Sequence, residues 1–241
     1  MNFAVENGFQ WFEIARDFPQ NLYLKRETIR KIRQISEKNG IMLIVHMANY
    51  LPTSTKIPEL RKGLIENIRN GIILADKVGS DRITLHTGFV EMGTSDMFYD
   101  SLIKNLKEIV KIGKMHGVNI CIENFDNKPA ALCIQVNDYL HVLNSVKDLK
   151  ATLDIGHANT TENKPSEYFS AVKGFVMNMH VHDNNGIKDE HKCIGEGNVD
   201  FKKLFSACKK AGYYGPFMLE LFPYENALKG KGRMMALWGK S

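Results

Sequence analysis

Apolar residues recur along the chain in two patterns, short continuous runs and longer stretches with apolar positions three or four residues apart. The short runs are typical of buried parallel strands, and the longer stretches are typical of amphipathic helices. The predicted strands are residues 11–15, 41–47, 82–86, 119–123, 151–154, 175–182 and 216–220. The predicted helices are residues 25–39, 57–78, 99–115, 137–147 and 200–211, followed by a basic helix at the end of the chain.

Glycines mark the expected ends of several of these helices. Gly40 and Gly79 directly follow predicted helices and Gly117 lies two residues past a third, at positions where a residue in the left-handed conformation often closes the last turn. Residues 3–8, which end at Gly8, resemble the last turns of a further helix. Because a chain seldom opens in mid-helix, we expect that one strand is missing before them, through truncation or an alternative start.

Alternating helices and near-continuous apolar strands indicate a parallel sheet covered by helices. No Gly-x-Gly-x-x-Gly motif follows an early strand, which disfavours a dinucleotide-binding sheet. The regular alternation instead predicts an α/β fold, a TIM (β/α)8-type barrel that spans residues 1–241 as a single domain. The pattern contains seven strands, so the barrel is expected to lack its first strand at the N-terminus.

Composition is that of an ordinary globular chain that is large enough for one core. Of the 241 residues, 44% are hydrophobic and 24% are charged. No apolar run reaches the roughly 20 residues of a membrane helix, and no leader-like segment opens the chain, so we expect a cytoplasmic protein without membrane partners. The four cysteines show no Cys-x-x-Cys spacing and are expected to be reduced. The net charge of +5 is spread along the chain and only weakly favours anionic partners.

Six consecutive predicted strands end in a side chain that can bind a metal ion. These residues are His46, His86, Glu123, Asp154, His180 and Glu220. The loops that follow add His157, Asp189 and His191. In a TIM barrel the carboxyl ends of the strands face the active site, so we expect all nine side chains to meet at one rim.

Nine imidazoles and carboxylates at one rim are costly unless cations compensate their charge. Mixed nitrogen and oxygen ligands suit zinc or manganese, with magnesium or cobalt also possible, rather than calcium. The absence of cysteine from the set disfavours a closed structural zinc site. We therefore expect an open catalytic site that holds one to three divalent metal ions.

Two further residues are candidates for contact with a substrate. His182 shares a strand face with His180. Three roles remain open for it: it supports a metal ligand, it contacts the substrate, or it binds a metal ion itself. Glu13 points inward on the first predicted strand, where it either contacts the substrate or pairs with an arginine inside the barrel.

The motifs at the strand ends resemble those of the xylose isomerase-like barrel superfamily, which contains sugar isomerases, sugar epimerases and endonuclease IV. The matching segments are VHMANY, LHTG, CIENF, LDIGHAN, HVHDN, DEHKCIGEGN and MLE. In the isomerase and epimerase branch, the resemblance implies a single metal held by Glu123, Asp154, His180 and Glu220, with Glu123 and Glu220 exchanging the substrate proton. Endonuclease IV has five further ligands beside these four, and together they hold three zinc ions. The positions of the five match His46, His86, His157, Asp189 and His191 of this chain.

Residues between the ligands favour the sugar branch. The corresponding motif of endonuclease IV is D-T-C-H, where this chain has D-I-G-H at 154–157. A second motif of that enzyme is H-L-N-D-S-K, where this chain has H-V-H-D-N-N at 180–185. Tyr50 also lies one residue later than the tyrosine that enters DNA in that enzyme. The resemblance therefore implies a metal-dependent sugar or sugar-phosphate isomerase or epimerase with a small carbohydrate substrate. The alternatives are a zinc phosphodiesterase acting on abasic sites in DNA and a catalytically silent carbohydrate-binding barrel.

Overall fold

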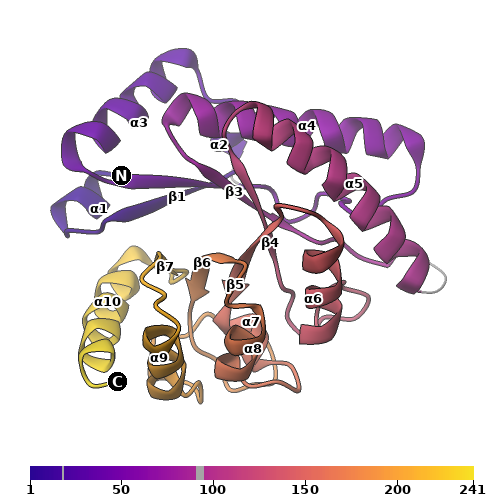
Figure 1. Cartoon of the computed structure of the whole chain (residues 1–241). Coiled ribbons are helices and arrows are strands. Elements are labelled where there is room, and N and C mark those ends of the chain that lie inside the picture. The colour runs from indigo at the N-terminus through magenta and orange to yellow at the C-terminus, as the bar shows by residue number, and fades with distance from the viewer. Residues whose placement is uncertain (18, 91–94) are drawn as a thin grey trace. The chain divides into compact units, whose positions relative to one another are not determined.

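Strands and helices alternate along the chain in the computed structural model, which describes residues 1–17, 19–90 and 95–241 (Figure 1). The strands are β1 (Trp11–Ala15), β2 (Met42–His46), β3 (Arg82–His86), β4 (Asn119–Glu123), β5 (Lys150–Asp154), β6 (Val176–Val181) and β7 (Phe217–Leu219). The helices are α1 (Asn2–Glu6), α2 (Pro19–Leu22), α3 (Arg26–Asn39), α4 (Pro58–Val78), α5 (Ser95–Met115), α6 (Val136–Ser145), α7 (Ile155–Asn159), α8 (Pro165–Val172), α9 (Phe201–Lys210) and α10 (Tyr224–Gly239). Within these ranges, every helix falls short of the length or the apolar character that crossing a membrane requires.

The described residues fall into two units. The first consists of Met1–Ile122 and Ser145–Lys150, and the second of Glu123–Asn144 and Ala151–Ser241. Strands β1 to β4 neighbour one another in chain order, and β5 to β7 do the same in the second unit. Glu123, the last residue of β4, is the first residue of the second unit. The single domain expected from the sequence stays a prediction.

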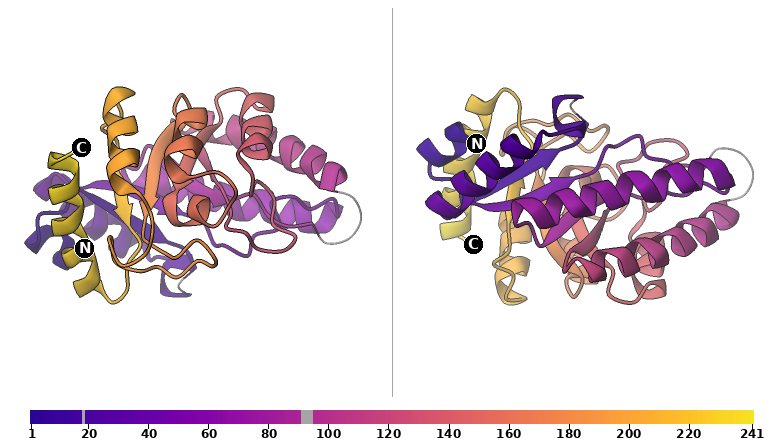
Figure 2. Two further views of the ribbon diagram at one scale, coloured as in Figure 1. Left: turned by 90° about the horizontal axis from the view of Figure 1, so that it is seen from below. Right: turned by 90° about the horizontal axis from the view of Figure 1, so that it is seen from above.

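Strands β1, β2 and β3 of the first unit pair in parallel, and helix α4 packs against two of them. Ala15 of β1 lies opposite His46 of β2, and His46 lies opposite Thr84 of β3. Helix α4 packs against β2 and β3 and contacts α3 and α5, and the view from above shows α4 and α5 running side by side (Figures 1 and 2). This arrangement places the carboxyl ends of β2 and β3, with their histidines, next to each other.

Helix α4 shows why the apolar pattern predicts these elements well. Pro58 occupies its first turn, where the fixed φ of proline suits a helix start, and Gly79 with φ of 83° closes it. Its buried apolar residues are Leu64, Ile65, Ile68, Ile72, Leu74, Ala75 and Val78. Leu60 has the spacing of this apolar face, but it is 45% exposed because it lies in the first turn, ahead of the packed part of the helix.

Helix α3 differs from the prediction in how deeply it is buried. Ile29, Ile32 and Ile35 recur at the spacing expected of an amphipathic helix, but each is only half-buried. Helix α3 follows β1, which stands at the end of the strand order, and it packs against α4. The predicted glycine ends are confirmed, with positive φ at Gly40, Gly79 and Gly117.

Register in the second unit brings metal-binding residue types to the same level. Asp154, the last residue of β5, lies opposite His180 of β6, and His180 lies opposite Met218 of β7. Helix α7 contacts β6 and α8, and α9 contacts both α8 and α10. In the left view of Figure 2, α9 in gold and α10 in yellow lie side by side.

Three short helices were not predicted from the sequence, namely α2, α7 and α8. Helix α7 has only five residues, too few for apolar periodicity, and it begins because the Asp154 side chain accepts a hydrogen bond of 2.6 Å from the His157 backbone. Helix α8 begins at Pro165 and buries Tyr168, Phe169 and Val172. Its proline and this spacing were available in the sequence. Helix α5 also begins earlier than predicted, at Ser95.

Candidate metal centre

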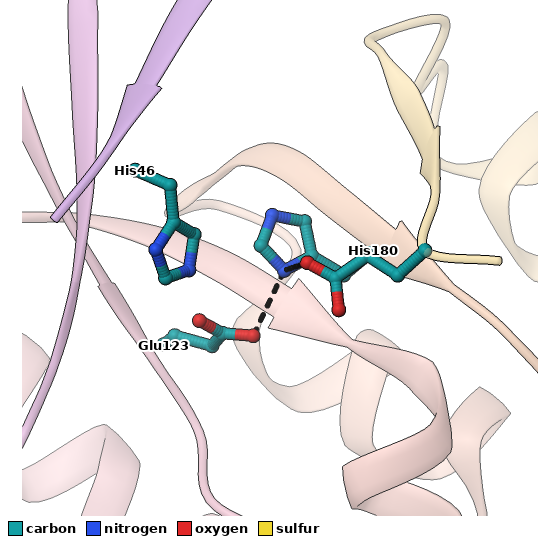
Figure 3. A group of neighbouring side chains, drawn as sticks. His46, Glu123 and His180 are labelled. Carbon is teal, nitrogen blue, oxygen red and sulfur yellow. Dashed lines mark hydrogen bonds and ion pairs between the residues drawn. The ribbon is translucent and has the colours of Figure 1, made fainter. Parts of the chain in front are cut away.

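Two carboxylates from strand ends converge on one imidazole in the second unit. Nδ1 of His180 lies 2.8 Å from Oε1 of Glu123 (Figure 3) and 2.9 Å from Oε1 of Glu220. The ligand atoms of these three residues lie within 4.8 Å of one another. One imidazole nitrogen carries at most one hydrogen, which the two carboxylates would have to share. Three groups aimed at one point in this way fit a cation held among them.

Asp154 stands beside this group, and its orientation is fixed by hydrogen bonds. Its Oδ2 atom lies 3.9 Å from Nδ1 of His180, and its side chain is fully buried. The side-chain amide of Asn124 donates to the carbonyl of Asp154 (3.0 Å) and accepts from its backbone N–H (2.8 Å). Sequence reasoning missed Asn124, although it directly follows the predicted ligand Glu123. A polar residue just past a strand end was the available signal.

Asp189 is the centre of a second group of imidazoles. Its Oδ2 atom lies 2.8 Å from Nε2 of His191 and 3.5 Å from Nε2 of His157, and its Oδ1 atom lies 3.4 Å from Nδ1 of His182. Nε2 of His182 lies 3.2 Å from Oδ2 of Asp154. The rings of His182 and His191 stack with centroids 4.0 Å apart. His182 therefore bridges Asp154 and Asp189.

Hydrogen bonds to backbone carbonyls select the tautomer of two of these histidines. Nδ1 of His157 donates to the carbonyl of Asn124 (2.8 Å), and Nδ1 of His191 donates to the carbonyl of Glu220 (2.9 Å). Because a carbonyl oxygen can only accept, Nδ1 carries the hydrogen in both rings. Nε2 of each ring faces Asp189, so it donates to this carboxylate when the ring is charged and offers its lone pair to a cation when the ring is neutral. Metal-binding histidines are commonly held in this way.

The carboxylates draw positive charge to this group. Burial alone would lower the pKa of His157, but Asp154 and Asp189 outweigh it and hold the pKa well above its usual value. Burial likewise acts to lower the pKa of His191, and the hydrogen bond to Asp189 raises it to about 9. Burial would raise the pKa of Asp189, but hydrogen bonds from His157 and His191 hold it well below its usual range. A bound cation would supply the same kind of compensation.

Gly156 makes the room that the His182 ring occupies. A Cβ atom at position 156 would lie 1.8 Å from Cε1 of His182, which is fully buried. Nδ1 of His182 and Oδ1 of Asp189 are buried and make no hydrogen bond among the described residues, although they face each other. Buried polar atoms of this kind usually have a ligand, an ion or a water as partner. The glycine and the facing pair thus also fit a cation at this position.

The first unit brings two of the predicted ligands together. His46 ends β2 and His86 ends β3, both are nearly buried, and their ring centroids are 5.4 Å apart. Nδ1 of His46 donates to the carbonyl of Met47 (2.7 Å), so the lone pair of the neutral ring is on Nε2. Glu13 is half-buried on β1, opposite Ile44. Its contact with a substrate stays a prediction.

The side chains present fit a divalent metal ion by their chemistry. The predicted ligands of the second unit are Glu123, Asp154, His157, His180, Asp189, His191 and Glu220. They offer imidazole nitrogen and carboxylate oxygen, which zinc and manganese accept. The four cysteines lie outside this ligand set; they are buried and form no disulfide bond. The identity of the individual ligands and the number of ions stay predictions.

Comparison with known proteins identifies the family. The family model described as the xylose isomerase-like TIM barrel matches residues 1–237. The chain therefore belongs to the xylose isomerase-like TIM barrel family. Its fold is an α/β barrel of the TIM type, with seven parallel strands in the part of the chain that the structure describes. The predicted fold class and the count of seven strands are confirmed.

Relatives include uncharacterised proteins and sugar epimerases. An uncharacterised protein of Methanocaldococcus jannaschii is 31% identical, over 96% of this chain and 81% of its own length. L-ribulose-5-phosphate 3-epimerase UlaE of Shigella flexneri serotype 5b is 24% identical, over 92% of this chain and 81% of its own. The crystal structure of a D-tagatose 3-epimerase-like protein has a TM-score of 0.90 at 29% identity, covering 98% of this chain and 91% of that one. The chain is thus similar to sugar epimerases, and it carries buried clusters of His, Glu and Asp.

Proposed function

We propose that this protein is a divalent-metal-dependent isomerase or epimerase of a small sugar or sugar phosphate. The observation that carries the proposal is the approach of Glu123 and Glu220 to the same nitrogen of His180, at 2.8 and 2.9 Å. Two carboxylates at one metal-binding point provide both a base and an acid for proton transfer at carbon. The similarity to a D-tagatose 3-epimerase-like protein and to UlaE supports the same chemistry.

In this proposal Glu123, Asp154, His180 and Glu220 hold the metal ion, which is zinc or manganese by preference and otherwise magnesium or cobalt. When bound, such an ion polarises neighbouring oxygens of a substrate and stabilises negative charge on them. With the remaining candidate ligands, which are predicted from the sequence, we propose that the protein holds one to three ions in total. These remaining ligands are His46, His86, His157, Asp189 and His191.

Proton transfer is assigned to the two glutamates. One carboxylate removes the proton from the carbon next to the substrate carbonyl, and the other returns a proton. Return to the opposite face of the same carbon gives an epimer, and return to the neighbouring carbon gives an isomer. In both cases one proton is removed and one is added, so no further reactant is needed. His182 and Glu13 are proposed to contact the substrate.

The test is turnover of a panel of ketoses and ketose phosphates by the protein loaded with manganese or zinc. In deuterated water, the product should carry deuterium at the carbon that exchanges its proton. Glu220→Gln keeps the shape of the side chain but removes the acid and base function, so kcat should fall about 100-fold or more. Glu225→Gln, an exposed residue of the α10 first turn, is the matched control and should leave kcat unchanged. A Glu220→Gln protein with wild-type kcat would show that Glu220 has no role in proton transfer.

A zinc phosphodiesterase acting on abasic DNA is the second candidate. The imidazoles around Asp189 favour it, because they offer more ligands than a single ion needs. Metal analysis and two substrates separate the candidates. Three tightly held zinc ions and cleavage of an abasic-site duplex would replace the sugar proposal. One exchangeable ion and turnover of a ketose would exclude the phosphodiesterase.

A further inference from the structure

The segment 183–199, which we term the 183–199 loop, follows β6 and carries two of the candidate ligands, Asp189 and His191. Its first part is closed by the backbone. The N–H of Asp183 donates to the carbonyl of Lys192, and the N–H of Lys192 donates to the carbonyl of Asp183, both at 2.8 Å. The part of the loop with Asp189 and His191 is therefore tied to the end of β6.

Asp183 differs from the other aspartates of this region because its carboxylate accepts all its hydrogen bonds from backbone N–H groups of the loop itself. It is fully buried. Oδ1 accepts from the backbone N–H groups of Asn184 (2.9 Å) and Val199 (3.2 Å), and Oδ2 accepts from those of Gly195 (2.8 Å) and Gly197 (2.9 Å). A carboxylate has about four positions for hydrogen bonds, and all are taken. Aligned N–H groups thus stabilise this buried charge, and a metal ion is not needed for it.

Gly197 lets the loop close around this carboxylate. A Cβ atom at position 197 would lie 2.3 Å from Oδ1 of Asp183 and 2.2 Å from the carbonyl oxygen of Asn184. Either contact is too short for any side chain, so the backbone approaches this closely only with glycine. The Gly-Glu-Gly sequence at 195–197 is therefore the cradle of the Asp183 carboxylate.

The other face of the loop is bonded to α7, the helix that carries His157. The side chain of Asn184 donates to the carbonyl of Gly156 (2.7 Å) and accepts from the side chain of Asn159 (2.8 Å). The same Asn159 amide donates to Asn198 near the end of the loop (2.8 Å). The loop and α7 are joined by this network of amide hydrogen bonds, in which Asn159 and Asn184 are buried. The network holds the loop beside the helix that carries His157.

We infer that Asp183 is a positioning residue, which builds the 183–199 loop so that Asp189 and His191 face His157 before any ligand arrives. It does so through the four N–H groups and without touching a metal or a substrate. The inference concerns the site of the proposed function, but it rests on the geometry of the loop alone. The two can therefore fail separately.

The first test is hydrogen exchange of backbone amides in the metal-free protein. Asp183→Asn replaces one carboxylate oxygen by an NH2 group, which faces two N–H donors and cannot accept from them. The amides of Gly195, Gly197 and Val199 should then exchange at least about tenfold faster, with exchange in β5 and β6 unchanged. Gly197→Ala keeps the carboxylate but closes its cradle, and it should speed exchange in the same loop. Unchanged exchange in the loop, or an equal increase in the strands, would overturn the inference.

The second test measures zinc affinity by competition with a chromophoric chelator. Asp183→Asn and Gly197→Ala should each weaken the binding of zinc about 10- to 100-fold, the usual effect of losing a residue that orients metal ligands. Asp200→Asn is the matched control, because Asp200 caps α9 by accepting from Lys203 N–H (3.0 Å) outside the loop. It should leave zinc affinity unchanged. If a variant exchanged the loop amides faster but kept wild-type zinc affinity, the positioning role would be refuted. If the wild-type protein itself did not bind zinc, the proposed function would be refuted, and the exchange test would decide whether Asp183 orders the loop.

Discussion

Replacement of Gly156 by alanine tests the packing of the metal centre directly, because two physical effects predict opposite signs. Gly156 lies in α7 with ordinary helical geometry, and alanine in a helix is favoured over glycine by about 1 kcal/mol. Against this, the new Cβ atom would lie 1.8 Å from Cε1, 2.2 Å from Nδ1 and 2.5 Å from Nε2 of the buried His182 ring. The ring must move, so the steric effect should dominate.

The magnitude follows from what the ring would lose. Overpacking a core costs about 1–3 kcal/mol. Moving the ring breaks its 3.2 Å hydrogen bond to Asp154 and leaves a buried group unsatisfied, which costs about 1–3 kcal/mol more. Subtracting the gain in helix propensity, we expect Gly156→Ala to destabilise the protein by about 1–5 kcal/mol. For a chain of this length that is a fall in Tm of about 2–20 °C.

The assay is thermal or urea unfolding of the metal-free protein, with two comparison variants. Gly63→Ala changes an exposed glycine in the second turn of α4, where a Cβ atom meets nothing within 4 Å, so it should stabilise the protein by up to about 1 kcal/mol. In a His182→Ala background the ring is gone, and Gly156→Ala should lose its penalty. If Gly156→Ala stabilised the wild-type chain as Gly63→Ala does, the packing of His182 against Gly156 would be wrong.

Two further predictions concern buried groups of the second unit. Asn124→Ala should lower stability by about 2–4 kcal/mol in urea unfolding, because the backbone N–H and carbonyl of Asp154 lose their partners. Asn39→Ala, at an exposed position of α3, should change stability by less than about 0.5 kcal/mol, and equal effects of the two would contradict this reading. Burial raises the pKa of the Cys208 thiol to about 12, so native protein at pH 8 should not be alkylated there by iodoacetamide, whereas unfolded protein should be. Since the pKa of Cys208 is higher in the folded than in the unfolded protein, its contribution to stability should be complete below about pH 9 and decline as the pH rises towards 12. Alkylation of native protein at Cys208 would refute the prediction.

Much of the fold was predictable because its signals are local. Strand and helix periods are visible within a few residues, so β3 and β4 were predicted with their observed bounds and α4 to within one residue. Helix α7 was not, since it depends on a single cap from Asp154 rather than on a repeated pattern. The partial burial of the apolar face of α3 also could not be predicted from the sequence, because the burial of a helix face depends on which elements pack against it.

The sequence by itself determined which residues are candidates for the metal centre. Parallel strands end at one edge, so a His, Glu or Asp at the end of each strand is predicted to lie at that edge. Only the tertiary structure decided the partners. It showed that Glu123 and Glu220 share His180, and that His182 bridges Asp154 and Asp189. It also showed that Asp183 is enclosed by four N–H groups. The physical reason is that these distances depend on strand register and on hydrogen bonds between residues far apart in the chain, which no local pattern encodes.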